Sequence, residues 1–121
     1  MSDTPHKWTP KQCEILARAS RNADGVRCRG AGAQAAAVSL EKSGLGRFAS
    51  IPSASRFYIN PAGRARLHEA TVHADSEAAR YLGNANEASE RGNAEKSRNL
   101  MQRCQEWMDA ANDLRGDGGE P

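Results

Sequence analysis

The cysteine and histidine side chains are the groups in this chain that could bind a metal ion or carry out nucleophilic catalysis. The three cysteines are far apart in the sequence: Cys13, Cys28 and Cys104. Zinc sites use closely spaced ligands, and His68 and His73 are five residues apart, which places them on different faces of a helix. The remaining histidine, His6, lies near the start. We therefore expect no metal site, no cofactor and no enzymatic activity, and we expect the cysteines to be reduced, mostly buried thiols.

A short glycine motif, Gly30-Ala31-Gly32, is the second feature with possible chemistry, because glycines let a backbone approach a phosphate group. The motif lacks the third glycine and the preceding buried strand of a dinucleotide-binding fingerprint. We interpret it as a flexible break before a helix.

Basic side chains are concentrated in the first part of the chain. Up to residue 70 the sequence has 11 Lys and Arg against 5 Asp and Glu, whereas from residue 71 onward it has 6 against 10. A positive first part attracts a polyanion and a negative second part repels one. If nucleic acid is a partner, we expect the first part to contact it; ordinary surface charge is the alternative explanation.

The start of the chain has clear signals for a helix over residues 10–20. Thr9 is a suitable N-cap, and Pro10 falls at the first helical position, where its missing N–H costs nothing. Trp8 and Cys13 stand at the two ends of a hydrophobic staple.

Shorter elements follow. Alternating apolar and basic residues predict a strand over 26–29, and an alanine-rich stretch predicts a helix over 33–43 that ends before Gly44. Two further runs, 47–51 and 56–59, predict a β-hairpin.

The second part has a helical pattern throughout. Asn60 is the expected N-cap of a segment over 61–91, which is either one long helix or two helices broken near 73–75. A last helix is expected over 94–114, and residues 116–121 are expected to be a disordered acidic tail.

The composition predicts a modest core and no membrane segment. Hydrophobic residues make up 38% of the 121 residues, below the usual share of roughly 45–50%. No stretch approaches the ~20 apolar residues that span a bilayer, and the first five residues lack the order of a secretion signal. We expect a cytoplasmic protein that does not bind membranes, and the small apolar fraction favours a partner such as a second copy.

Two segments resemble winged helix-turn-helix regulators of the MarR type. Residues 39–47 read SLEKSGLGR and residues 57–67 read FYINPAGRARL. The first segment is similar to the end of a helix in that family, which reads "leucine-glutamate…glycine-leucine". The second segment is similar to the stretch after the wing, which reads "threonine-proline-alanine-glycine-arginine", with Asn60 in place of the threonine. The resemblance covers about residues 9–70 and implies a mainly α protein with a small β-hairpin wing (α+β). The segment between residues 20 and 33 is short for this family, so the helix-turn-helix is expected to be truncated.

The resemblance also implies how DNA would be bound. In this family the second helix of the helix-turn-helix enters the major groove and the wing touches the backbone or minor groove. The outward residues of the recognition helix would be Gln34, Ser39, Glu41 and Lys42. The wing would contribute Arg47 and Arg56. Candidates for phosphate contacts would be Arg27, Arg29, Arg64 and Arg66.

The second part resembles one tetratricopeptide-type helix–turn–helix repeat, over residues 82–85 and 92–96. In the regulator family, the long helix after the wing commonly forms the dimer, which agrees with an apolar stripe along residues 67–88. The expected residues of an interaction or dimer surface are Leu67, Tyr81, Leu82, Leu100, Met101, Trp107 and Met108.

Together these patterns predict a winged-helix-like domain over residues 1–70 and a helical hairpin for dimerisation or interaction over 71–115, followed by the tail. The leading hypothesis is a dimeric, non-enzymatic regulatory protein that binds double-stranded DNA. The alternative is a protein–protein interaction module, such as an adaptor or inhibitor, that uses the helical hairpin without sequence-specific DNA binding.

Overall fold

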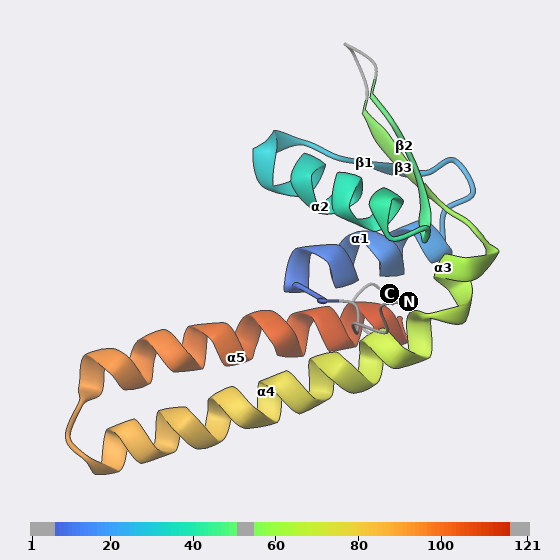
Figure 1. The fold of residues 1–121 in the computed structure, drawn as a ribbon. Helices are drawn as coiled ribbons and strands as arrows, with labels where there is room; N and C mark the ends of the chain where they lie inside the picture. Colours follow the sequence, from blue (N-terminus) through green and yellow to red (C-terminus); the bar gives the residue numbers. More distant parts are fainter. Residues whose placement is uncertain (1–6, 51–54, 117–121) are drawn as a thin grey trace, which may run out of the picture.

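The chain is mainly helical and has a small antiparallel sheet, which confirms the expected α+β class. The computed structural model describes residues 7–50 and 55–116. In chain order the elements are α1 (Pro10–Ser20), β1 (Val26–Arg27), α2 (Gly30–Lys42), β2 (Gly46–Ala49), β3 (Arg56–Ile59), α3 (Pro61–Ala65), α4 (Leu67–Glu90) and α5 (Ala94–Arg115) (Figure 1). We call α1 to α3 with the sheet the front unit, and α4 with α5 the hairpin. None of the described helices is both long and apolar enough to cross a membrane.

Helix α1 begins where the capping signals predict. The hydroxyl of Thr9 accepts a hydrogen bond from the backbone N–H of Gln12 at 3.2 Å, and Pro10 is in the first turn. The Gln12 side chain is buried, and its amide donates to the hydroxyl of Ser39 at 3.2 Å. This hydrogen bond links α1 to α2.

Helix α2 begins earlier than expected, at Gly30 instead of residue 33. The interpretation of Gly30-Ala31-Gly32 as a break before the helix is therefore wrong, because these residues form its first turn. Strand β1 is correspondingly shorter than the predicted 26–29. The alternation is nevertheless as expected, since Cys28 is buried and Arg27 is exposed.

The sheet has the strand order β1-β3-β2, and both neighbouring pairs are antiparallel. The predicted hairpin of β2 and β3 is confirmed, although residue 51, the expected end of its first strand, lies outside the described residues. Phe57, at the centre of β3, is 0% exposed. Because successive side chains of a strand point to opposite faces, Arg56 and Tyr58 belong to the outer face of the sheet.

Two glycines allow the β-hairpin and α3 to pack closely. A Cβ atom at Gly46 would lie 2.2 Å from Cζ of Phe57, and one at Gly63 would lie 2.2 Å from the carbonyl oxygen of Leu45. Any side chain at either position would force the backbone apart. Asn60 caps α3 as predicted, because its side-chain oxygen accepts from the N–H of Gly63 at 2.8 Å.

Helices α4 and α5 form the predicted antiparallel hairpin. Helix α4 is continuous through residues 73–75, so the break considered there does not occur; the helical segment is instead interrupted at Arg66, between α3 and α4. The buried positions of α4 are all alanine: Ala70, Ala74, Ala78, Ala85 and Ala88. We call these five residues the alanine seam. Small side chains at a helix contact permit a short distance between helix axes.

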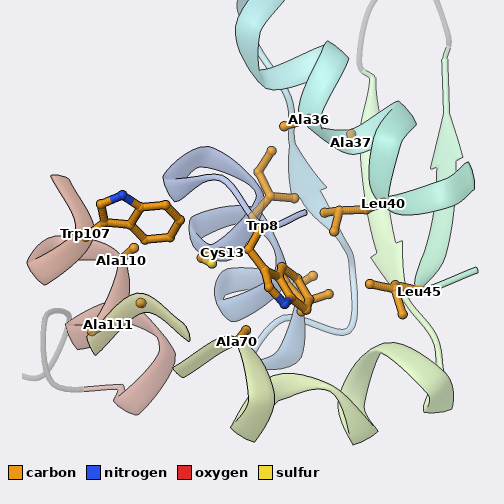
Figure 2. Packing of buried hydrophobic residues seen from close by; sticks show 14 of the residues in the cluster. Trp8, Cys13, Ala36, Ala37, Leu40, Leu45, Ala70, Trp107, Ala110 and Ala111 are labelled. Carbon is orange, nitrogen blue, oxygen red and sulfur yellow. The ribbon is translucent and has the colours of Figure 1, made fainter. Parts of the chain in front are cut away.

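One hydrophobic core joins the front unit to the base of the hairpin. Trp8 lies beside α1, near Leu40, Leu45 and Ala70 (Figure 2). Its indole N–H donates to the carboxylate of Glu69 at 3.1 Å. The core therefore contains residues from both sides of residue 70, where a domain boundary was predicted.

The far end of the hairpin lies outside this core. Trp107, on α5, belongs to the core and meets the ring of His73 edge-on at 5.3 Å between centroids. Ala85 and Ala88 are buried between the two helices but are not part of the core. Figure 1 shows this end of the hairpin extending beyond α1.

Candidate nucleic-acid interface

The outer face of the sheet carries three arginines and one tyrosine. Arg27 of β1 is paired with Arg56 of β3, and Arg47 of β2 is paired with Tyr58 of β3. Paired residues of antiparallel strands project to the same face, so these four side chains lie opposite the buried Phe57. Arg27 and Arg47 are exposed, and the other two are half-buried. We call Arg27, Arg47, Arg56 and Tyr58 the basic sheet face.

Tyr58 is held by an arginine and by a tight turn. The guanidinium carbon of Arg47 lies 5.2 Å from the centre of the tyrosine ring, within the range of a cation–π contact. Gly25 closes the turn before β1 by donating to the carbonyl of Asn22 at 3.0 Å. Its φ is +83°, and a Cβ atom there would lie 2.8 Å from the tyrosine ring, so the position requires glycine.

The pairing of Arg27 with Arg56 places like charges directly opposite each other, an arrangement that destabilises a sheet. One guanidinium nitrogen of Arg56 donates to the carbonyl oxygens of Asp24 and Gly25, at 3.3 and 3.4 Å. These hydrogen bonds offset part of the repulsion and fix the side chain.

The outward face of α2 is less suited to DNA than the resemblance implies. Gln34 and Lys42 are exposed, as expected. Ser39 is half-buried and its hydroxyl accepts from the Gln12 amide, so the expectation that it points outward is wrong. The carboxylate of Glu41 accepts from a backbone N–H of β2 at 3.0 Å, which fixes a negative charge beside this face.

The remaining arginines assigned to phosphate contacts have different environments. Arg29 is exposed at the N-cap of α2. Arg64 donates to the carbonyl of Ser20 at 3.0 Å, which ties α3 to α1. Arg66 is half-buried and pairs with Glu69 at 2.9 Å. Contacts within the molecule therefore account for Arg64 and Arg66, and neither belongs to the basic sheet face.

Two further arginines, Arg18 and Arg21, adjoin the basic sheet face, and the sequence-based predictions did not include them. They lie at the end of α1 and line a pocket of about 460 Å³ together with Arg27 and Arg56. Their spacing of three residues at the end of a predicted helix is the signal that could have identified them as neighbours. Tyr58 was identifiable from strand alternation, because it follows Arg56 by two residues.

The residues predicted for a dimer or partner surface divide by exposure. Leu82, Met101 and Met108 are exposed by 42%, 44% and 45%. Trp107 is only 6% exposed and packs in the core, so it belongs to the inside of this molecule and not to a partner surface. The other three are half-buried: Leu67, Tyr81 and Leu100.

All three cysteines are buried free thiols. Burial raises the pKa of Cys13 to about 12. Burial also raises the pKa of Cys28, against a smaller lowering by a hydrogen bond with the backbone of Phe57. Both thiols therefore stay protonated and inert near neutral pH. Within residues 7–50 and 55–116, no group of three or more His, Cys, Asp or Glu side chains is arranged to hold a metal ion.

Comparisons of the chain with models of protein families, with curated proteins and with solved structures found no match. The function of the molecule is therefore inferred from its own residues.

Proposed function

We propose that this protein is a small DNA-binding protein that holds the phosphate backbone of a duplex on its basic sheet face. The observation that carries the proposal is the direct pairing of Arg27 with Arg56, with Arg47 on the same face. Three strands bring together three guanidinium groups on one face, and such a concentration of positive charge favours a polyanion.

Arginine suits this role because its planar fork can donate two parallel hydrogen bonds to a phosphate group. Phosphate contacts position a protein on DNA, whereas base contacts specify the sequence. On α2, Gln34 and Lys42 are exposed and are the side chains there that suit base edges. The proposed binding therefore derives its affinity mainly from the backbone and depends strongly on salt.

The order of elements in the front unit also supports the proposal. A helix, a short strand, a second helix and a β-hairpin follow one another. The second helix and the β-hairpin stand where the resemblance of residues 39–47 and 57–67 to winged helix regulators puts the recognition helix and the wing. The resemblance to these regulators is also the reason why we propose a regulatory role for this protein. Residues 21–29, where that family has a helix and a turn, contain a turn and β1, and α2 stands where the resemblance puts the recognition helix.

A titration of a fluorescent duplex tests the proposal. We expect Arg47→Gln with Arg56→Gln to weaken binding about tenfold at low salt, and to lower the salt dependence by about two phosphate contacts. The matched control is Arg98→Gln with Arg103→Gln, which removes the same charge from exposed positions of α5. Fluorescence anisotropy at about 50 and 200 mM salt gives both quantities.

Two results would contradict the proposal. One is no binding by the unaltered protein at low salt. The other is an equal loss of affinity in both double variants, since that would mean that only net charge matters. Thermal unfolding of each variant separates loss of binding from loss of folding.

The hairpin supports a second candidate function, capture of a protein partner or a second copy. Leu82, Met101 and Met108 are large apolar side chains exposed on it, and side chains of this type favour contact with another protein. Replacing the three by alanine would abolish such an association and leave duplex binding unchanged. Light scattering of the unaltered protein and the triple variant measures self-association.

A further inference from the structure

Seven exposed positions of the hairpin repeat at intervals of seven residues. Residues spaced in this way lie on one side of a helix. We call these positions the heptad stripe: Asp75, Leu82 and Ser89 of α4, and Ala94, Met101, Met108 and Arg115 of α5. Arg115 forms an ion pair with Asp75, which joins the two parts of the stripe across the contact between the helices. The stripe therefore occupies one face of the hairpin.

A hydrogen bond between the helices shows which positions of the stripe lie side by side. The hydroxyl of Ser97 donates to the carbonyl oxygen of Ala85 at 2.9 Å. Leu82 is three residues before Ala85, and Met101 is four residues after Ser97. Because α4 and α5 are antiparallel, Leu82 and Met101 lie at the same level of the hairpin.

The heptad stripe points away from the front unit. Ala110 of α5 lines the space between α5 and α1, and Met108 is two residues away, about 200° around the helix. In Figure 1 the front unit lies above α5 near one end of the hairpin. A partner can therefore reach the stripe without displacing the front unit.

The composition of the heptad stripe suits contact with a copy of itself. Its two charged side chains, Asp75 and Arg115, neutralise each other. Its other members are apolar or small and uncharged. A stripe without net charge does not repel an identical stripe.

We propose that the heptad stripe binds the same stripe of a second copy, so that two hairpins form an antiparallel four-helix bundle. The inference rests on the second candidate function, capture through the hairpin, and it names the partner and the register. The contact is related by a two-fold axis at the level of Leu82 and Met101, where each of these side chains meets its own counterpart. Seven residues to either side, Met108 faces Ala94 of the second copy and Asp75 faces Ser89.

The antiparallel register fits the side chains that it brings together. Met108 lies over an alanine, and large residues opposite small ones pack without voids. The hydroxyl of Ser89 can donate to the carboxylate of Asp75. In a parallel bundle Met108 would instead lie over Asp75 and would remove the ion pair with Arg115 from water, which is costly.

The contact area is sufficient for a weak dimer. The overlapping parts of the two hairpins are ~27 Å long and ~20 Å wide, from the rise per residue and the diameter of a helix. Roughly 1,100 Å² is buried in total, just above the ~1,000 Å² expected of a biological interface. We therefore expect a dissociation constant of about micromolar strength and single chains in dilute solution.

Disulfide cross-linking at matched positions tests the inference. Met101 and Met108 are exposed by 44% and 45% on the same helix, but only Met101 lies at the proposed axis. We expect Met101→Cys to give a cross-linked dimer in a glutathione buffer. Met108→Cys should remain uncross-linked, because its two copies would be ~21 Å apart and a disulfide needs Cα atoms within about 7 Å. A mixture of Met108→Cys with Ala94→Cys should be cross-linked again.

Two further measurements complete the test. Leu82→Cys repeats it on α4, since this position should also link to its own copy. The native cysteines are buried, so the unaltered protein is the blank for cross-linking, and its mass by light scattering should rise with concentration. Circular dichroism shows whether each variant is folded.

The possible outcomes separate this inference from the proposed function. The mass of one chain at every concentration would overturn the inference and leave the face to a different protein. Equal cross-linking of Met101→Cys and Met108→Cys would also overturn it, because it would indicate random collision. If Met101→Cys and Leu82→Cys link only to each other, the bundle is parallel and the register is wrong. A dimer of the expected register without any duplex binding would support the inference and refute only the proposed function.

Discussion

The front unit and the hairpin are stabilised in different ways. In the front unit, large side chains such as Phe57, Leu16 and Leu40 are completely buried, and glycine occurs where strands and helices come closest. In the hairpin, the alanine seam of α4 faces α5, and many charged side chains are exposed. The front unit therefore depends on a few well-packed positions, whereas the hairpin depends on a repeated contact between two helices.

The difference also extends to electrostatics. The front unit concentrates arginines on one face of its sheet, although two of them repel each other. The hairpin pairs its charges along the helix, as in Arg91 with Glu87 at 2.6 Å and Arg80 with Glu77 at 2.7 Å. Like charges gathered on one face are the arrangement expected of a binding surface, and locally paired charges are the arrangement expected of a solvated helix.

The largest effect is expected from Phe57→Ala in the front unit. This side chain is 0% exposed and is the largest of the fully buried ones, so its removal should lower the free energy of unfolding by about 3–5 kcal/mol. Leu82→Ala, at an exposed position of the hairpin, should change it by less than about 0.5 kcal/mol. Urea unfolding followed by circular dichroism measures both. Similar losses in the two variants would refute the distinction drawn between the two regions.

An identical change at two glycines should have opposite effects. Gly46→Ala would place a Cβ atom 2.2 Å from the Phe57 ring, and such overpacking should lower the free energy of unfolding by about 1–3 kcal/mol. Gly83→Ala lies inside α4 with nothing within 4 Å of the new methyl group, and should raise it by about 0.5–1 kcal/mol. Thermal unfolding of both variants is the measurement. The comparison fails if the two midpoints move in the same direction.

The smallest effect is expected from Glu77→Gln in the hairpin. A hydrogen bond from Arg80 lowers the pKa of Glu77, so this pair adds stability above the ordinary carboxyl pKa and loses it as the pH falls through the lowered value. Arg80 is exposed and Glu77 is half-buried, so solvent screens the pair, and we expect a loss at pH 7 smaller than the gain from Gly83→Ala. Denaturant midpoints at pH 7 and pH 3 should show that the difference between variant and unaltered protein shrinks in acid. A difference that grows in acid would contradict the assignment.

Local signals in the sequence were enough to place most elements. Thr9 with Pro10 and Asn60 with Pro61 predicted two helix starts correctly, because a capping side chain and a proline act on the nearest few residues. The extent of α2 was not predictable in the same way. Glycines at its start are poor helix formers, and residues 30–32 are exposed, so their helical form follows from the continuation of a helix that Ala36, Ala37 and Leu40 hold in the core.

The candidate site could be predicted only in part. Arg27, Arg47 and Arg56 were identified from strand alternation and from the family resemblance. Their grouping on one face depends on the register of β1 with β3, which joins segments distant in sequence. Arg18 and Arg21 were missed for the same reason, since only the tertiary fold places the end of α1 beside the sheet. Ser39 was misplaced because nothing near it in the sequence shows that Gln12 is its partner.

The extension of the hairpin beyond the core has a consequence for how the molecule opens. Ala85 and Ala88 contribute to the contact between α4 and α5 but not to the core that joins these helices to α1. Their separation therefore costs the contacts of Ala85 and Ala88 and the hydrogen bond from the Ser97 hydroxyl to the carbonyl of Ala85, and it leaves the sheet and its arginines undisturbed. We therefore expect one end of each long helix to unfold only with the whole protein and the other end to open at a lower free-energy cost. We expect a ligand at the outer end to stabilise that end without changing the affinity of the arginine-rich side, because Ala85 and Ala88 do not belong to the core that joins α4 and α5 to the front unit.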